Sequence, residues 1–309
     1  MKHHFELNWT EFCFFSANVI HVFGKKDLSD LYSLYKRTML ALKVPVADAG
    51  LIRETSIGEV KLLLNKQPSL IISFHYGMYW KLPNQLINQG CKVAILVSRD
   101  IIQNQQRFST KNLAPSLRQN LVFIDAEDPS IFFRIRILNQ DGFHVLCYMD
   151  GGVGAKQLSS INKEKLSNVN FGQGVVCVRK GVFEIAYLLR LPIHYFPDLS
   201  TSSALAGIVS FYPIDGEHRG AYVKRILHET YLLLYGCINK DLTRWEGWFF
   251  MHHSLLPIPN SFNKGHLYLP FAINKRYYLM NVYNYESREV GVENFGFVKD
   301  SIGCQLDIC

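Results

Sequence analysis

Residues 70–83 read LIISFHYGMYWKLP, and this stretch decides the fold. It opens with a short apolar run that predicts a buried β-strand, and a loop containing Gly77 follows. The continuation MYWKLPNQLINQG, at 78–90, predicts a helix that Gly90 ends. A buried strand that leads directly into a helix is typical of α/β proteins with a parallel or mixed sheet.

The same alternation of strand and helix continues along most of the chain. Further strands are predicted at 91–100, 121–126, 142–152, 191–198 and 204–214, and helices at 5–45, 58–66, 104–120, 129–140, 181–190 and 219–240. We therefore expect an α/β fold whose mainly parallel or mixed sheet is covered by helices.

The last fifty residues have a different composition. The segment KGHLYLPFAINKRYYLMNVYNYESREVGVENFGFV, at 264–298, is rich in Tyr, Val and Phe and predicts strands, and prolines 257 and 259 precede it. We expect an α/β domain at 1–257, with N-terminal helices within 1–66, and a small β-rich C-terminal appendage at 258–309.

Composition narrows the classes of function. Of 309 residues, 48% are hydrophobic and 19% are charged, which is typical of a globular protein. The formal net charge is +7, but no run of five like charges occurs, so a nucleic-acid partner is not expected. The excess of cations favours anionic partners such as phospholipid headgroups, an acidic carrier protein or a phosphopantetheine arm.

The seven cysteines contain no CxxC pair and no cluster with zinc spacing. We expect free thiols in a reducing cytoplasm, with no metal and no bound cofactor. No signal peptide or membrane-spanning segment is predicted. The apolar face of residues 5–23 has two interpretations, packing on the protein's own body or peripheral attachment at the inner membrane.

His75 is the first candidate for chemistry, because it stands just past the end of the strand within 70–83. In open α/β sheets, ligands gather at the carboxyl ends of strands. A single histidine is also often a structural residue that is simply hydrogen-bonded, so position alone leaves both interpretations open.

Five segments together resemble the bacterial lysophospholipid and lipid A late acyltransferases. They are HYGMYW at 75–80, VAILVSRD at 93–100, VLCYMDGGVG at 145–154, NVNFGQGVVCVRKGVFEIAYLLRLPIHYF at 168–196 and DLTRWEGWFFMHH at 241–253. HYGMYW is similar to the HFGNWE-type block of that family, and the five occur in the family's order over roughly 60 to 255.

The resemblance implies that His75 is a catalytic base and that an acid should stand five residues after it. Trp80 occupies that position, and an indole offers only an N–H donor. Asp150 is the candidate replacement acid, because it also ends a strand and enters a Gly-Gly loop; a loop-capping aspartate is the alternative. We predict that Asp150 approaches His75, and that Gly77 and Trp80 line the substrate site.

The activity that the resemblance implies is transfer of a fatty acyl group to an amine or hydroxyl acceptor. The co-substrate would be the thioester of acyl carrier protein or of CoA, and Arg99 and Arg179 are candidates for gripping its phosphates. The acceptor could be a small molecule, a peptide or a lipid. Two alternatives stay open: a non-catalytic family member that binds acyl chains or peptides, and a conventional peripheral-membrane lipid acyltransferase.

Overall fold

The computed structural model describes residues 7–43, 64, 67–99, 102, 113–151, 163–197, 208–256 and 267–306. The chain forms two compact units, and each is assembled from separate segments. The first unit combines Met1–Pro45, Asn168–Cys177 and Ile238–Cys309, and the second combines Val46–Ser167 and Val178–Cys237. The units therefore divide the chain elsewhere than at the expected boundary between 257 and 258, because the N-terminal helices pack with the C-terminal sheet.

The second unit is built on a six-stranded sheet with the order β3-β2-β4-β1-β7-β8. The strands are β1 (Leu70–Ser73), β2 (Lys92–Val97), β3 (Leu121–Asp125), β4 (Phe143–Tyr148), β7 (Ile193–Tyr195) and β8 (Val209–Phe211). All neighbours pair in parallel except β7 and β8, which are antiparallel. The sheet is therefore mixed, which is one of the two arrangements that the sequence predicts.

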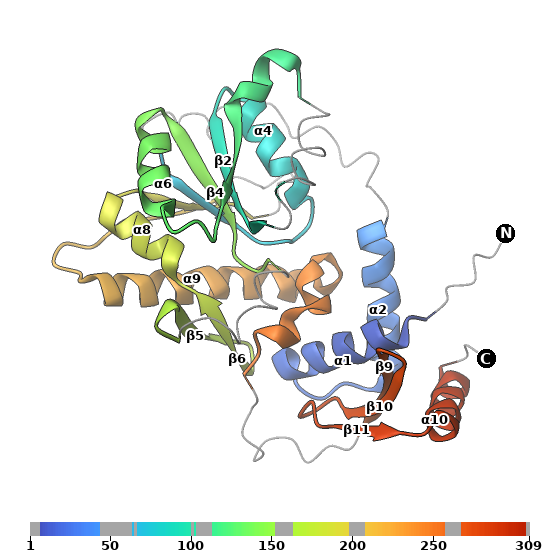
Figure 1. Cartoon of the computed structure of the whole chain (residues 1–309). Coiled ribbons are helices and arrows are strands. Elements are labelled where there is room, and N and C mark those ends of the chain that lie inside the picture. The colour runs from blue at the N-terminus through green and yellow to red at the C-terminus, as the bar shows by residue number, and fades with distance from the viewer. Residues whose placement is uncertain are drawn as a thin grey trace. The chain divides into compact units, whose positions relative to one another are not determined.

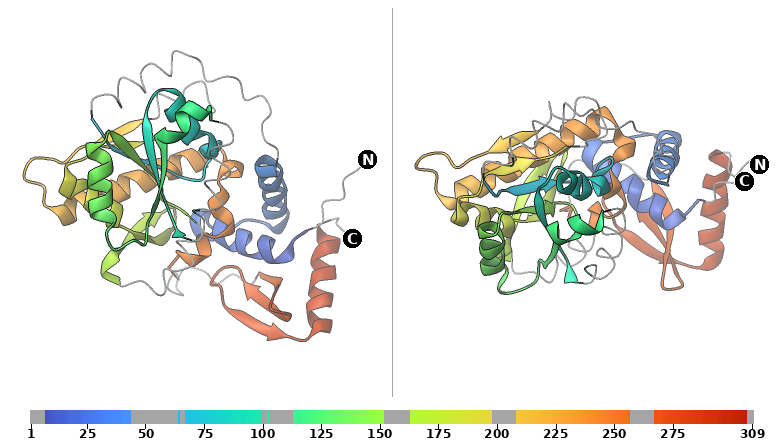
Figure 2. Two further views of the ribbon diagram at one scale, coloured as in Figure 1. Left: turned by 45° about the horizontal axis from the view of Figure 1, so that its top comes forward. Right: turned by 90° about the horizontal axis from the view of Figure 1, so that it is seen from above.

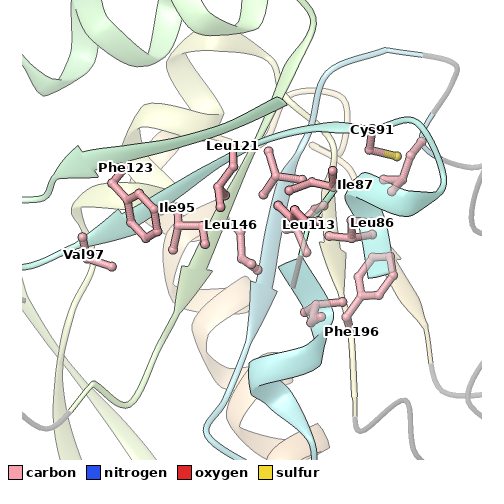
Figure 3. Packing of buried hydrophobic residues seen from close by; sticks show 14 residues of the cluster. Leu86, Ile87, Cys91, Ile95, Val97, Leu113, Leu121, Phe123, Leu146 and Phe196 are labelled. Atoms are coloured by element: carbon pink, nitrogen blue, oxygen red, sulfur yellow. The ribbon is translucent and has the colours of Figure 1, made fainter. Parts of the chain in front are cut away.

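Helices flank this sheet on both sides. They are α4 (Leu82–Asn88), α6 (Ile131–Gln140), α8 (Gly181–Leu189) and α9 (Arg219–Lys240), whose last three residues belong to the first unit. Figure 1 shows α4 and α6 on opposite sides of β2 and β4. Leu86 of α4 packs with Ile71 and Leu146 in one hydrophobic cluster (Figure 3), whereas Phe74 meets the ring of Tyr231 of α9, with centroids 5.2 Å apart.

The first unit contains a three-stranded antiparallel sheet in the order β11-β10-β9, with strands β9 (Tyr268–Ile273), β10 (Arg276–Asn281) and β11 (Ser287–Val290). The sheet lies between helices α1 (Trp9–Phe23) and α10 (Val292–Gln305) (Figure 2). Helix α2 (Leu28–Lys43) belongs to the same unit. Phe271 of β9 meets Phe14 of α1, whereas Tyr277 of β10 meets Phe295 of α10.

Helix α1 is buried within its own unit. Phe12 and Phe15 have no solvent exposure, and Phe15 contacts both Tyr35 of α2 and Trp248. Packing on the protein's own body is therefore the interpretation of residues 5–23 that the structure supports. No helix of the described residues is long and apolar enough to cross a membrane.

The structure departs from the expected elements in several places. The helix expected over 5–45 is two helices, because the chain turns at Gly24, whose φ of +82° suits glycine. The end of the segment expected to be strand-like, 292–298, belongs instead to α10, which covers one side of the small sheet. Tertiary packing against Tyr277 overrides the local β preference of its aromatic residues.

A hairpin that the sequence did not predict is formed by β5 (Leu166–Phe171) and β6 (Gly174–Arg179). Its turn includes Gly172, which has a φ of +60°. Residues 115–120, within a segment expected to be helical, form the 3-10 helix η2 (Pro115–Asn120). Of the helix expected at 58–66 only Leu64 is described, and residues 104–112 lie outside the described residues.

The other elements within the described residues are short 3-10 helices. They are η1 (Tyr79–Lys81), η4 (Lys163–Lys165), η6 (Leu242–Arg244), η7 (Glu246–Phe249) and η8 (Met251–His253).

Candidate active site

The candidate site is formed where two neighbouring parallel strands of the second unit end. In the pairing of β1 with β4, Ser73 lies opposite Tyr148. His75 and Asp150 each stand two residues beyond these partners, so the register itself brings them together. The main-chain N–H of Met149 still donates to the carbonyl oxygen of Ser73, at 2.9 Å, and the ladder gives way to side-chain contacts beyond it.

The carboxylate of Asp150 binds both the main-chain N–H and the imidazole ring of His75. His75 Nδ1 lies 2.8 Å from Asp150 Oδ1. The main-chain N–H of His75 donates to both carboxylate oxygens, with N···O distances of 3.0 and 3.2 Å. The predicted approach of Asp150 to His75 is thus confirmed as a direct contact.

The two side chains differ in their exposure to solvent. The side chain of Asp150 is 6% exposed, whereas that of His75 is 20% exposed, so the imidazole is the more accessible of the pair. An acceptor oxygen at Nδ1 favours the tautomer that carries the proton on Nδ1 and the lone pair on Nε2. This arrangement, a base oriented by a carboxylate, is the one used for proton transfer in acyl-transfer enzymes.

Two tyrosines, which the sequence did not single out, pack against the imidazole. The ring of Tyr79 meets the ring of His75 edge-on, with centroids 4.5 Å apart, and the ring of Tyr148 lies tilted against it at 5.0 Å. The hydroxyl of Tyr148 donates to the carbonyl oxygen of Tyr79 at 2.8 Å. The one sequence signal that could have pointed to Tyr148 is its position two residues before Asp150, at the end of the same predicted strand.

Trp80 and Gly77 lie in the turn that follows His75. Gly77 has a φ of +62°, in the left-handed region that favours glycine. Trp80 is 44% exposed on η1, and its ring meets that of Tyr79 edge-on at 5.3 Å. Trp80 therefore presents exposed apolar surface beside Tyr79, the tyrosine whose ring contacts His75.

Arg99 forms an ion pair at the ends of two other strands of the same sheet. Its Nε lies 2.8 Å from Asp125 Oδ2, while its side chain remains 67% exposed. The hydrogen bond that Arg99 donates to Asp125 raises the pKa of this guanidinium further, so it remains a cation. A phosphate at Arg99 would share the guanidinium with Asp125.

Arg179, at the end of β6, lies within electrostatic range of Cys147 on β4. Burial raises the pKa of the Cys147 thiol to about 12; the charge of Asp150 adds to this and the charge of Arg179 opposes it. Cys147 is therefore a protonated thiol at neutral pH and not a nucleophile. Among the described residues, no group of His, Cys, Asp and Glu side chains could hold a metal ion.

No protein-family model matches this chain, and no curated protein matches it in sequence. The resemblance to the acyltransferases therefore depends on the five segments alone, at 75–80, 93–100, 145–154, 168–196 and 241–253.

Proposed function

We propose that this protein is an acyltransferase that moves a fatty acyl group from an acyl carrier protein or CoA thioester to an amine or hydroxyl acceptor. His75 is the general base and Asp150 is its carboxylate partner. The observation that carries the proposal is the 2.8 Å contact between His75 Nδ1 and Asp150 Oδ1, just beyond the carboxyl ends of the neighbouring parallel strands β1 and β4.

The reaction requires one proton to move twice. His75 Nε2 takes the proton of the acceptor hydroxyl or amine as that atom attacks the thioester carbonyl. The imidazolium is stabilised by Asp150 while the tetrahedral intermediate exists. When the carbon–sulfur bond breaks, the imidazolium returns the proton to the departing sulfur, so the histidine ends neutral and a free thiol is released.

Asp150 takes the place of the acid that the acyltransferase pattern has five residues after the histidine. The family pattern supplies its carboxylate from the turn after the histidine, where this chain has Trp80. Here the carboxylate comes from the neighbouring strand, and it binds the main-chain N–H of His75 as well as the ring. Trp80 is then free to serve as apolar surface for the acyl chain or the acceptor, a role that suits a large aromatic ring.

The two alternatives differ in their support. Attachment to a membrane through residues 5–23 is disfavoured, because Phe12, Phe15 and their neighbours on α1 are buried in their own unit. A protein that binds acyl chains without turnover is favoured by the tyrosines that cover much of His75. The experiment must therefore measure turnover and binding separately.

Purified protein should be mixed with octanoyl-CoA, palmitoyl-CoA or the matching acyl carrier thioesters, with glycerol, ethanolamine or a lysine peptide as acceptor. Mass spectrometry of the acylated acceptor is the preferred readout, because the exposed Cys304 would react with thiol reagents. His75→Ala should lower turnover by about 10²–10⁴-fold, the usual contribution of a general base.

Asp150→Asn should lower turnover by a similar factor of about 10²–10⁴, because the imidazolium loses its charged partner. Its amide oxygen can keep the Oδ1 contacts, so folding should persist. Glu217→Gln is the matched control: it removes the charge of a carboxylate paired with Arg225 at 2.8 Å elsewhere in the second unit. Donor binding with no acylated product from the native protein would favour the non-catalytic alternative.

A further inference from the structure

Tyr148 is the last residue of β4, two residues before Asp150. Its ring is buried enough that burial raises the pKa of the phenol above its ordinary value of 10, with the charge of Asp150 adding to the shift. The hydroxyl therefore remains a proton donor at neutral pH. It donates to the main-chain carbonyl oxygen of Tyr79 at 2.8 Å, which joins the end of β4 to the turn after β1.

The turn that carries Tyr79 is shaped by its sequence. Gly77 allows a positive φ, and the N–H of Lys81 donates to the carbonyl oxygen of Met78 at 3.0 Å, which closes the 3-10 turn η1. The side chain of Met78 is buried. The turn thereby returns the ring of Tyr79 to His75, four residues earlier in the chain.

Three rings then contact one another in pairs. The centroids of His75 and Tyr79 are 4.5 Å apart, those of His75 and Tyr148 are 5.0 Å apart, and those of Tyr79 and Tyr148 are 5.6 Å apart. Asp150 binds the imidazole at Nδ1. The carboxylate fixes the Nδ1 edge of the ring, and the two tyrosine rings limit the tilt of the imidazole about that contact.

We propose that Tyr148 is a positioning residue for His75. Its hydroxyl fastens η1 to β4, so that the rings of Tyr79 and Tyr148 hold the imidazole in the orientation in which Nδ1 meets Asp150. This inference rests on the proposed function, because orientation of a base matters only where the base transfers a proton. Catalytic groups need positioning to within about 0.5 Å and 10–20°, which packing and supporting hydrogen bonds provide.

Tyr148→Phe removes only the hydroxyl and keeps the ring. Its matched control is Tyr187→Phe in the same unit, because Tyr187 also donates to a main-chain carbonyl, that of Glu217, at 2.8 Å. The first readout is the exchange of the His75 Nδ1 proton with water, followed by NMR on the folded protein. Exchange should become about five- to tenfold faster in Tyr148→Phe, the factor expected for loss of one hydrogen bond, and stay unchanged in Tyr187→Phe.

A merely structural role for Tyr148 would lower the melting temperature and leave the exchange unchanged; that result overturns the proposal. Tyr79→Leu is a second variant, which keeps the carbonyl and removes the ring, and it should also accelerate exchange. The NMR measurement needs no substrate, so its outcome does not depend on whether the protein transfers acyl groups. Where acyl transfer is measured, Tyr148→Phe should lower kcat and leave KM unchanged.

Discussion

Two histidines buried in the second unit predict how its stability depends on pH. His144 of β4 and His194 of β7 are 5% and 2% exposed, and each has its Nδ1 2.9 Å from a serine hydroxyl, those of Ser69 and Ser210. Burial lowers the pKa of each from 6.5 to about 4, and for His144 the neighbouring His194 adds to the effect. Both are therefore neutral in the folded protein at pH 6, where the unfolded chain already binds protons.

The sign and size of the effect follow from these values. A folded pKa below the unfolded one contributes stability that is complete above about pH 6.5 and is lost as the pH falls toward 4. Lowering the pKa from 6.5 to about 4 corresponds to about 3 kcal/mol for each histidine. Within that range each contributes a slope of up to about 1.4 kcal/mol per pH unit to the free energy of unfolding.

Urea unfolding followed by circular dichroism between pH 7 and 4.5 measures this slope. His144→Asn and His194→Asn remove the titrating ring and keep an amide that can bond the serine, so each should reduce the slope by up to about 1.4 kcal/mol per pH unit. His228→Asn changes an exposed residue of α9 and should leave the slope unaltered. If the double variant kept the full slope, carboxylates would carry the acid sensitivity and the reasoning would be refuted.

Three further predictions test the remaining structure. Gly247→Ala should destabilise the first unit by about 1–3 kcal/mol in thermal unfolding, because a Cβ there would overlap the ring of Trp245; an unchanged midpoint would contradict this packing. Deletion of residues 1–23 should yield an insoluble or molten chain by near-UV circular dichroism, because α1 covers one face of the β9–β11 sheet; a soluble, cooperatively unfolding product would contradict that. Affinity for an acyl carrier protein should weaken as salt rises, because an exposed cation such as Arg99 is screened; affinity independent of salt in titration calorimetry would exclude electrostatic docking.

The main elements of the second unit could be predicted from local sequence. Runs such as LIISF and LVFI are long enough to form strands and too apolar to lie outside a core, and their alternation with helical segments predicted an α/β fold with a mainly parallel or mixed sheet. The first unit was harder. Residues 292–298 carry β-favouring residues yet lie in α10, because packing against Tyr277 outweighs a propensity that spans only about 1 kcal/mol.

The sequence by itself determined that His75 and Asp150 each follow a buried strand, and parallel strands of one sheet end at the same edge. Only the tertiary structure decided that β1 and β4 are neighbours, with a register that places Ser73 opposite Tyr148 and so brings the carboxylate to Nδ1. Tyr79 and Tyr148 likewise meet across 69 residues of chain. Local pattern records which residues end a strand, whereas strand order depends on the packing of the whole sheet, and that order made the contact between His75 and Asp150.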